Sequence, residues 1–96
     1  MSKSTFSSEY AVFRETIKDL RLRAELTQTD LAARLERPQS YVSKFEAGER
    51  RLDFIETMAI CDAIGLSLQD FVSELTSRLR QKQKGRSLQS RRGAGK

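Results

Sequence analysis

Residues 28–47 read QTDLAARLERPQSYVSKFEA, and this stretch predicts two short helices joined by a tight turn. Thr27 can cap the first helix, with Asp30 three residues later as in a capping box. Pro38 marks the end of that helix, because proline biases the preceding residue away from helical geometry and suits the start of a new helix. We therefore expect a second helix over residues 39–47.

The helix expected over 39–47 has an apolar side and a polar side. If Val42 and Phe45 point inward, the rotation of about 100° per residue leaves the polar positions outside. The outward residues are then Gln39, Ser40, Ser43 and Lys44. A helix held by its apolar side with a free polar side is what a reader of the DNA major groove requires. We predict that these side chains contact bases, since Gln suits adenine and Lys suits guanine, and an ordinary solvated helix face is the alternative.

Helical periodicity and caps also predict helices outside residues 28–47. One begins after Ser7 or Ser8 and runs to about Glu25, one lies between Asp53 and Gly65, and one follows Ser67. No stretch shows sustained period-two alternation, so the predicted fold class is all-α with five helices. The predicted organisation is a flexible N-terminus over 1–7, a DNA-binding domain over 8–80 and a basic disordered tail over 81–96.

The net charge of +5 is distributed unevenly along the chain. Residues 78–96 contain eight Lys and Arg and no acidic residue, whereas residues 1–77 contain ten Lys and Arg against 13 Asp and Glu. The basic pI of about 9.8 is therefore weak support for nucleic-acid binding by the domain itself. For the tail, a solvated extension and an arm that follows DNA both remain open.

The composition argues against several classes of protein. A single cysteine, Cys61, and no histidine leave no internal disulfide, no zinc site and no usual pair of nucleophile and base. We therefore expect no enzyme activity, no metal and no cofactor. The longest purely apolar run, Met58 to Cys61, is far shorter than the roughly 20 residues that cross a bilayer, so we expect a cytoplasmic, nucleoid-associated protein without membrane contact.

Three motifs in order resemble the Cro/CI-type, or XRE, family of helix-turn-helix regulators. They are LTQTDLAARL at 26–35, PQSYVSKFEAGERRLD at 38–53 and AIGLSLQDF at 63–71, and the resemblance extends from about Leu20 to Leu75. It implies a lambda-repressor-like five-helix domain that binds a two-fold symmetric double-stranded DNA operator as a homodimer and regulates transcription, for example as a repressor. Glu36 departs from the glycine usual in the turn and Pro38 from the usual Ser or Thr cap. Because a left-handed Glu36 would cost roughly 1 to 2 kcal/mol, we expect a turn of another shape.

The resemblance also implies roles for residues around the expected 39–47 helix. Arg21 and Glu46 correspond to an internal ion pair, and Gln28 to a glutamine that bonds a phosphate and braces the DNA-contacting helix. Cationic residues flank that helix at both ends, where they can meet the DNA backbone or simply remain solvated. These are Arg37, Arg50 and Arg51. Tyr41, expected to be half exposed, can contact a phosphate or a thymine methyl, or cover the turn.

The helix expected over 54–64 is apolar nearly all round, which exceeds what a small core requires. The surplus predicts a partner surface shared with the following helix. Candidate dimer residues are Ile60, Ile64, Leu68, Val72 and Leu79. A fully enclosed central helix is one alternative, and an antitoxin-like module that binds another protein through these helices is a second.

Overall fold

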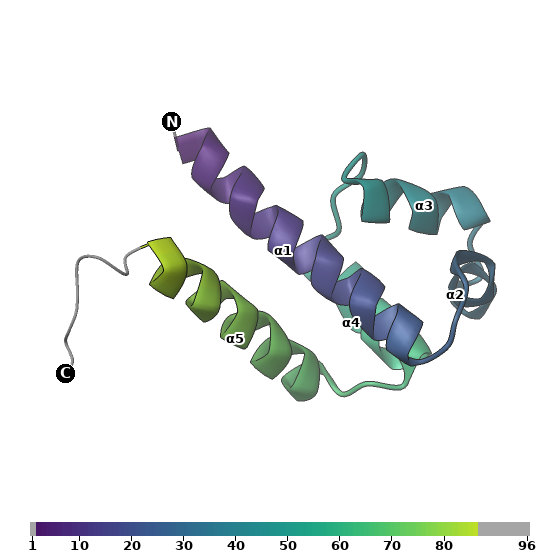
Figure 1. The fold of residues 1–96 in the computed structure, drawn as a ribbon. Coiled ribbons are helices and arrows are strands. Elements are labelled where there is room, and N and C mark those ends of the chain that lie inside the picture. The colour runs from purple at the N-terminus through teal and green to yellow at the C-terminus, as the bar shows by residue number, and fades with distance from the viewer. Residues whose placement is uncertain (1, 87–96) are drawn as a thin grey trace.

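A computed structural model describes residues 2–86, with side chains described over 8–82, and shows five helices (Figure 1). They are α1 (Ser2–Arg23), α2 (Gln28–Leu35), α3 (Gln39–Ala47), α4 (Phe54–Ile64) and α5 (Leu68–Arg86). No strand occurs over residues 2–86, which confirms the all-α prediction. None of the helices in this range is both long enough and apolar enough to span a bilayer.

The core lies where the five helices meet. α1 and α5 run side by side, while α2 packs against both α3 and α4 (Figure 1). Each helix contributes at least one buried apolar side chain. Among them are Ile17, Leu31, Val42, Phe45, Ile60 and Phe71. The convergence on one cluster fixes α3 at the edge of the domain with its inner side covered.

The predicted caps are present at the start of α2 and at both ends of α4. The Thr27 hydroxyl accepts from the Asp30 amide while the Asp30 carboxylate accepts from the Thr27 amide, both at 2.9 Å. Asp53 and Glu56 form the same reciprocal pair at the start of α4. Gly65 ends α4 in the left-handed region at φ 89°, as expected of its position.

The turn between α2 and α3 corrects one expectation. Glu36 is left-handed, with φ 58° and ψ 44°, so the prediction of another turn shape is wrong. The Glu36 amide donates to the carbonyls of Ala32 and Ala33, and the Arg37 amide donates to Ala32 at 3.0 Å. These bonds close the end of α2 and hold Glu36 in a left-handed backbone conformation that residues other than glycine rarely adopt.

Replacing Glu36 with glycine is expected to stabilise the domain by about 1 kcal/mol, since glycine carries no Cβ to strain the left-handed backbone. For a domain of this size that gain corresponds to a rise in Tm of about 4 to 8 °C in a thermal melt. Glu36→Ala is the control, because alanine keeps the strain and is expected to give no comparable rise. An equal rise in both variants would show that the Glu36 side chain, rather than the backbone, is unfavourable.

The bounds of the first and last helices differ from expectation. α1 begins at Ser2 rather than after Ser7 or Ser8, because residues 2–7 contain no proline or glycine to stop it. α5 continues to Arg86 rather than ending near 80, since Gln, Lys and Arg are good helix formers. The expected disorder over 87–96 lies outside the described residues.

Candidate nucleic-acid interface

The two sides of α3 differ as predicted in their exposure. Val42 and Phe45 are fully buried, whereas Gln39, Ser40 and Lys44 are exposed. Ser43 is half buried, and its hydroxyl donates to the Ser40 carbonyl at 3.3 Å. The four side chains predicted to contact bases therefore lie on the part of α3 that the core does not use.

A buried ion pair fixes the carboxyl end of α3. The Arg21 guanidinium donates from Nε to Glu46 Oε2 at 2.7 Å and from NH2 to Oε1 at 2.9 Å, with both side chains almost fully buried. Its third nitrogen, NH1, donates to the Leu26 carbonyl at 2.6 Å. This bidentate pair joins α1 to α3 and matches the internal ion pair that the family resemblance implied.

Arg14 is a second tie between α1 and α3, and the sequence reasoning missed it. Its NH1 donates to the Glu46 carbonyl at 2.7 Å. A Cβ added at Gly48, which is left-handed at φ +83°, would lie 2.9 Å from Arg14 Nε. Arg14 precedes Arg21 by seven residues, so both point from the same side of α1, and that spacing was the available signal.

Gln28 links the buried ion pair to the exposed start of α3. Its Nε2 donates to Glu46 Oε1 at 2.9 Å, and its Oε1 accepts from Gln39 Nε2 at 2.8 Å. Gln28 thus contacts α3 at both of its ends. The bracing part of its predicted role has a structural counterpart in these two bonds.

Tyr41 is buried rather than half exposed, so that expectation is wrong. Only 8% of the residue is exposed, because its ring packs edge-on against Phe45 and lies near two guanidinium groups. The Cζ atoms of Arg37 and Arg50 lie 4.6 and 4.8 Å from its ring centre. Burial raises the pKa of the Tyr41 hydroxyl. The ring covers the turn side of α3, which was one of the roles considered for it.

The loop cations after α3 are partly engaged within the domain. Arg50 donates to both Glu56 oxygens, at 3.2 and 2.9 Å, and the Cζ of Arg51 lies 4.2 Å from the Tyr10 ring centre. The hydrogen bonds from Arg50 lower the pKa of the Glu56 carboxyl. Glu56 therefore caps α4 and orients Arg50 at once, and only the capping role was predictable from its spacing.

Because the pKa of Glu56 is lowered in the folded state, this carboxylate stabilises the domain above its ordinary value of 4.5 and ceases to do so as the pH falls through the folded value. Glu56→Gln is therefore expected to lower the free energy of unfolding at pH 7 and to differ less from wild type at pH 3. Urea unfolding across this pH range measures the gap. Glu49→Gln is the control in the preceding loop, because the Glu49 side chain has no hydrogen bond or ion pair among the described residues, and a smaller loss of stability is expected at pH 7. A difference in unfolding free energy between Glu56→Gln and wild type that stayed constant from pH 7 to pH 3 would contradict the link between Glu56 ionisation and stability.

The predicted dimer candidates do not all face solvent. Ile60 is 0% exposed, so its assignment to a partner surface is wrong: Thr57, Ile60 and Cys61 form the inward side of α4. Ile64, Leu68 and Leu79 are half buried, and Val72 is exposed. A helix that is apolar all round gives no periodicity from which to choose its inward side.

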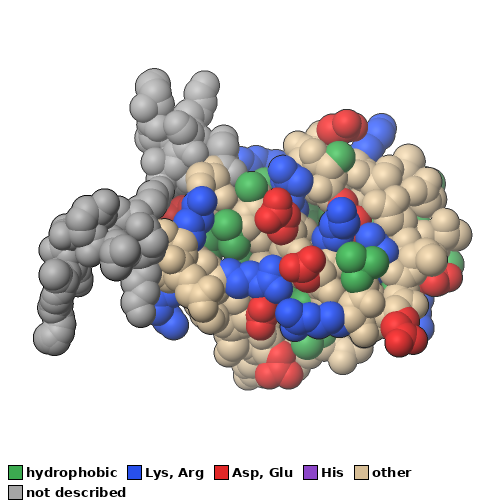
Figure 2. All heavy atoms as spheres, viewed as in Figure 1, with side chains coloured by type: hydrophobic (Ala, Val, Ile, Leu, Met, Phe, Trp, Pro, Cys, Tyr) green, Lys and Arg blue, Asp and Glu red, His purple; other side chains and the backbone are tan. Residues whose placement is uncertain are grey.

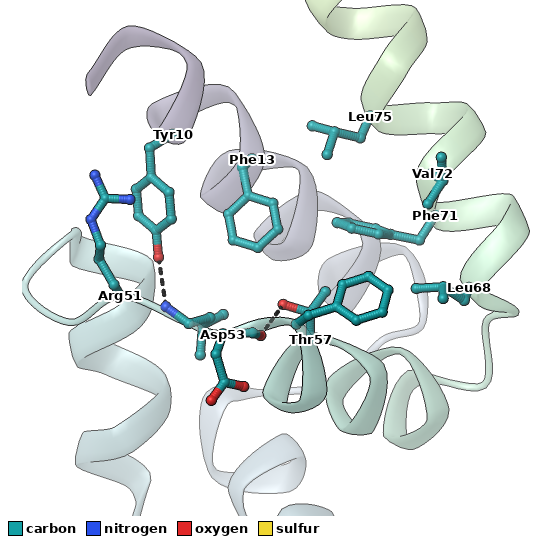
Figure 3. A pocket seen from close by; sticks show the side chains of 11 residues that line it. Tyr10, Phe13, Arg51, Asp53, Thr57, Leu68, Phe71, Val72 and Leu75 are labelled. Atoms are coloured by element: carbon teal, nitrogen blue, oxygen red, sulfur yellow. Dashed lines mark hydrogen bonds between the residues drawn. The ribbon is translucent and has the colours of Figure 1, made fainter. Parts of the chain in front are cut away.

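Other apolar side chains occupy the outer surface of α4 and α5. The exposed residues are Phe54, Ile55, Met58 and Val72, and we call them the α4/α5 surface. Phe54 and Val72 also line an open groove of about 360 Å³ between α1, α4 and α5. Figure 3 shows Phe13, Phe71 and Leu75 pointing into this groove and Arg51 beside Tyr10 at its edge. The groove and the α4/α5 surface together form an apolar region that nothing in the chain's described part covers.

The charged side chains do not form one continuous basic area on the face drawn in Figure 2, where Lys and Arg alternate with Asp and Glu. This mixture agrees with the acidic excess of residues 1–77. On this face, any attraction to DNA therefore comes from individually placed cations.

Comparison with known proteins agrees with this geometry. A family model for a helix-turn-helix domain matches residues 12–75. The chain is similar to the solved structure of an XRE-family like protein from Pseudomonas syringae pv. tomato str. DC3000, with 42% identity, a TM-score of 0.74, and coverage of 80% of this chain and 94% of that one. No curated protein sequence matches significantly.

A mutant of the restriction-modification controller protein C.Esp1396I has a similar fold, with a TM-score of 0.70 at 24% identity over 74% of this chain and 90% of its own. The family match covers α2 and α3 together with most of the core that holds them. The chain therefore belongs to the XRE family of helix-turn-helix proteins and is a DNA-binding transcription regulator.

Proposed function

We propose that this protein binds a two-fold symmetric DNA operator as a homodimer, with α3 of each copy in the major groove. The observation that carries the proposal is the division of α3, which exposes Gln39, Ser40 and Lys44 while a buried ion pair and a covered apolar side fix its position. A rigid helix with a free polar side meets the geometric requirement of groove reading. The proposal includes no catalysis and no cofactor.

The proposed base contacts follow from the donors and acceptors on α3. Gln39 can pair with the N6 and N7 edge of adenine, and Lys44 can donate to O6 and N7 of guanine. Ser40 and Ser43 carry hydroxyls that can serve either a base or a phosphate. One well-made bidentate contact is worth about 1 to 3 kcal/mol of discrimination.

The proposed phosphate contacts come from residues at the two ends of α3. Arg37 precedes the helix and Arg51 follows it, and both are exposed. Arg50 and Gln28 are retained in this group, although each also holds a partner inside the domain. Tyr41 is retained only through its hydroxyl, because the rest of the side chain is largely buried. Each phosphate that a cation neutralises makes the slope of log affinity against log salt concentration more negative by about 0.9.

The proposed homodimer uses the α4/α5 surface. An exposed apolar area on a small domain is typical of an interaction site, and a two-fold contact there would present two α3 helices to one side of the DNA. Half-sites contacted by such a dimer lie about 34 Å apart, one turn of the duplex.

Selection of bound sequences from random DNA, at a stated salt concentration, tests the proposal. The expected result is an inverted repeat whose half-sites are centred about 10 base pairs apart. Enrichment of a single half-site, or of no sequence, would contradict symmetric operator binding.

Met58→Glu is expected to convert the dimer to a monomer, because it places a charge in the middle of the α4/α5 surface, where Met58 is 42% exposed. Equilibrium sedimentation measures the change, and operator affinity is expected to fall with it. Leu22→Glu is the matched control, since Leu22 is an exposed apolar residue of α1 outside this surface. A wild-type monomer at high micromolar concentration would contradict the preformed dimer and favour a different protein partner for this surface.

A further inference from the structure

Glu56 holds Arg50 by one edge of its guanidinium group and leaves a second edge free. We propose that Glu56 is a positioning residue for DNA binding, because it keeps two parallel N–H donors of Arg50 available for one phosphate of the DNA backbone. The inference rests on the proposed phosphate contact of Arg50. It gives the capping residue in the first turn of α4 a second task in recognition.

The bonds that Arg50 makes within the domain occupy three of its five N–H groups. NH1 donates to Glu56 Oε1 at 3.2 Å and to the Arg51 carbonyl at 2.9 Å, and NH2 donates to Glu56 Oε2 at 2.9 Å. The Nε–H and the second N–H of NH2 have no partner among the described residues. In a planar guanidinium these two groups lie along one edge and point the same way. That edge can bind two oxygens of one phosphate.

Arg21 uses its guanidinium group in the opposite way. It bonds Glu46 through Nε and NH2, at 2.7 and 2.9 Å, and its side chain is only 6% exposed. The edge that Arg21 gives to a carboxylate is therefore the edge that Arg50 keeps, on a side chain that is 38% exposed. Of these two arginines, only Arg50 retains a complete pair of donors for DNA.

Glu56 is itself fixed, which makes it suitable for orienting Arg50. Its Oε1 also accepts from the Asp53 amide at 2.9 Å, in the capping box of α4. Tyr41 adds a further restraint, since the Cζ of Arg50 lies 4.8 Å from its ring centre. A mobile arginine side chain loses rotamer freedom when it binds a partner. Because Arg50 is already held before DNA arrives, less of that entropy is lost on binding.

Arg50→Lys, made alone and together with Glu56→Gln, tests the inference in the full-length protein. Lysine keeps the positive charge but has no planar pair of donors. Affinity for the selected operator is measured by fluorescence anisotropy at a stated salt concentration and at a temperature where thermal melts show every variant folded. In the wild-type background, Arg50→Lys is expected to weaken binding about tenfold, the lower end of what a hydrogen bond to a charged group supports. In the Glu56→Gln background the loss is expected to be less than about threefold.

The possible outcomes separate the role of Glu56 from the contact made by Arg50. Equal losses in the two backgrounds would overturn the role of Glu56 and leave the phosphate contact intact. A larger loss in the Glu56→Gln background would overturn it too, because Glu56 would then compete with the phosphate for Arg50. No loss for Arg50→Lys would mean that only the charge of Arg50 matters, and not its free edge. If Arg50→Ala also left the affinity and its salt dependence unchanged, the proposed phosphate contact itself would fail.

Glu49→Gln separates positioning from the removal of a negative charge. Glu49 lies in the loop that also contains Arg50, and its side chain has no hydrogen bond or ion pair among the described residues. Loss of a carboxylate reduces repulsion of DNA, so Glu49→Gln is expected to bind the operator as tightly as the wild type or more tightly. Glu56→Gln is expected to bind about tenfold more weakly than Glu49→Gln, because it releases Arg50. Equal affinities of these two variants would overturn the inference.

NMR of the wild-type protein makes the test independent of how well Glu56→Gln folds. Because Glu56 holds both NH1 and NH2, we expect hindered rotation of the Arg50 guanidinium, with separate proton signals from these two groups. The Nε proton of Arg50 is expected to exchange rapidly with solvent in the free protein and more slowly in the operator complex. Merging of the NH1 and NH2 signals on binding would show that Arg50 leaves Glu56 to reach the phosphate, and would overturn the inference.

Discussion

Arg21→Ala is expected to lower the free energy of unfolding by about 3 to 5 kcal/mol and to abolish operator binding through loss of the folded state. The Glu46 carboxylate would remain buried without its guanidinium, and the Leu26 carbonyl would lose its donor. Small domains have only about 5 to 15 kcal/mol of stability in total, so such a loss removes much or all of it.

Urea unfolding and DNA binding, measured on the same samples, check this result. Arg78→Ala is the matched control, because Arg78 also bonds two carboxylates, those of Asp19 and Glu74, but at the surface. Pairs of that kind contribute about 0 to 1 kcal/mol each, and we expect a correspondingly small effect. If Arg21→Ala stayed folded and failed to bind, Arg21 would act by orienting α3 or by contacting DNA directly, rather than through global stability.

Phe45→Ala is expected to cost about 3 to 5 kcal/mol, the range for truncating a buried aromatic side chain. Phe45 is 0% exposed, and its ring meets Tyr41 edge-on at 5.5 Å between centres. Its removal would leave a cavity directly beneath α3. We therefore expect both a lower Tm and weaker DNA binding at temperatures where the variant is still folded.

Leu22→Ala is the control for Phe45→Ala, since Leu22 is an apolar residue of α1 that is 52% exposed and lies outside the α4/α5 surface. Surface substitutions of this kind change stability by about 0.5 kcal/mol or less. Thermal melts of the two variants, each compared with wild type, give the contrast. Equal destabilisation would contradict the cavity beneath α3 as the cause of the loss.

Local signals in the sequence were sufficient to predict most of the fold. The caps at Thr27 and Asp53 each act on an amide three residues away, and Gly65 acts on the last turn of its own helix. Interactions of such short range can be recognised from the spacing of residues in the sequence alone. The separation of α3 into buried and exposed sides followed in the same way from the helical repeat.

The features that the sequence did not predict depend on contacts between distant segments. Arg14 reaches the Glu46 carbonyl across 32 positions, and its spacing of seven residues from Arg21 indicates the side of α1 on which it lies but not its partner. Tyr41 is buried because Arg37 and Arg50, which lie beyond opposite ends of α3, converge on its ring. The expectation for Glu36 was wrong for a local reason, since the hydrogen bonds from the Glu36 and Arg37 amides to the end of α2 offset the strain of the left-handed backbone.

Because α3 is attached to α1, the two helices α2 and α3 cannot be transferred to another protein on their own. A graft of residues 28–47 onto another scaffold would carry Glu46 without the guanidinium of Arg21 and without the contact from Arg14. The transplanted unit would then hold an unmatched carboxylate and an α3 of undefined tilt. A graft would therefore have to include α1 and the core that α4 and α5 complete, and specificity is better exchanged between relatives by changing the outward residues of α3 in place.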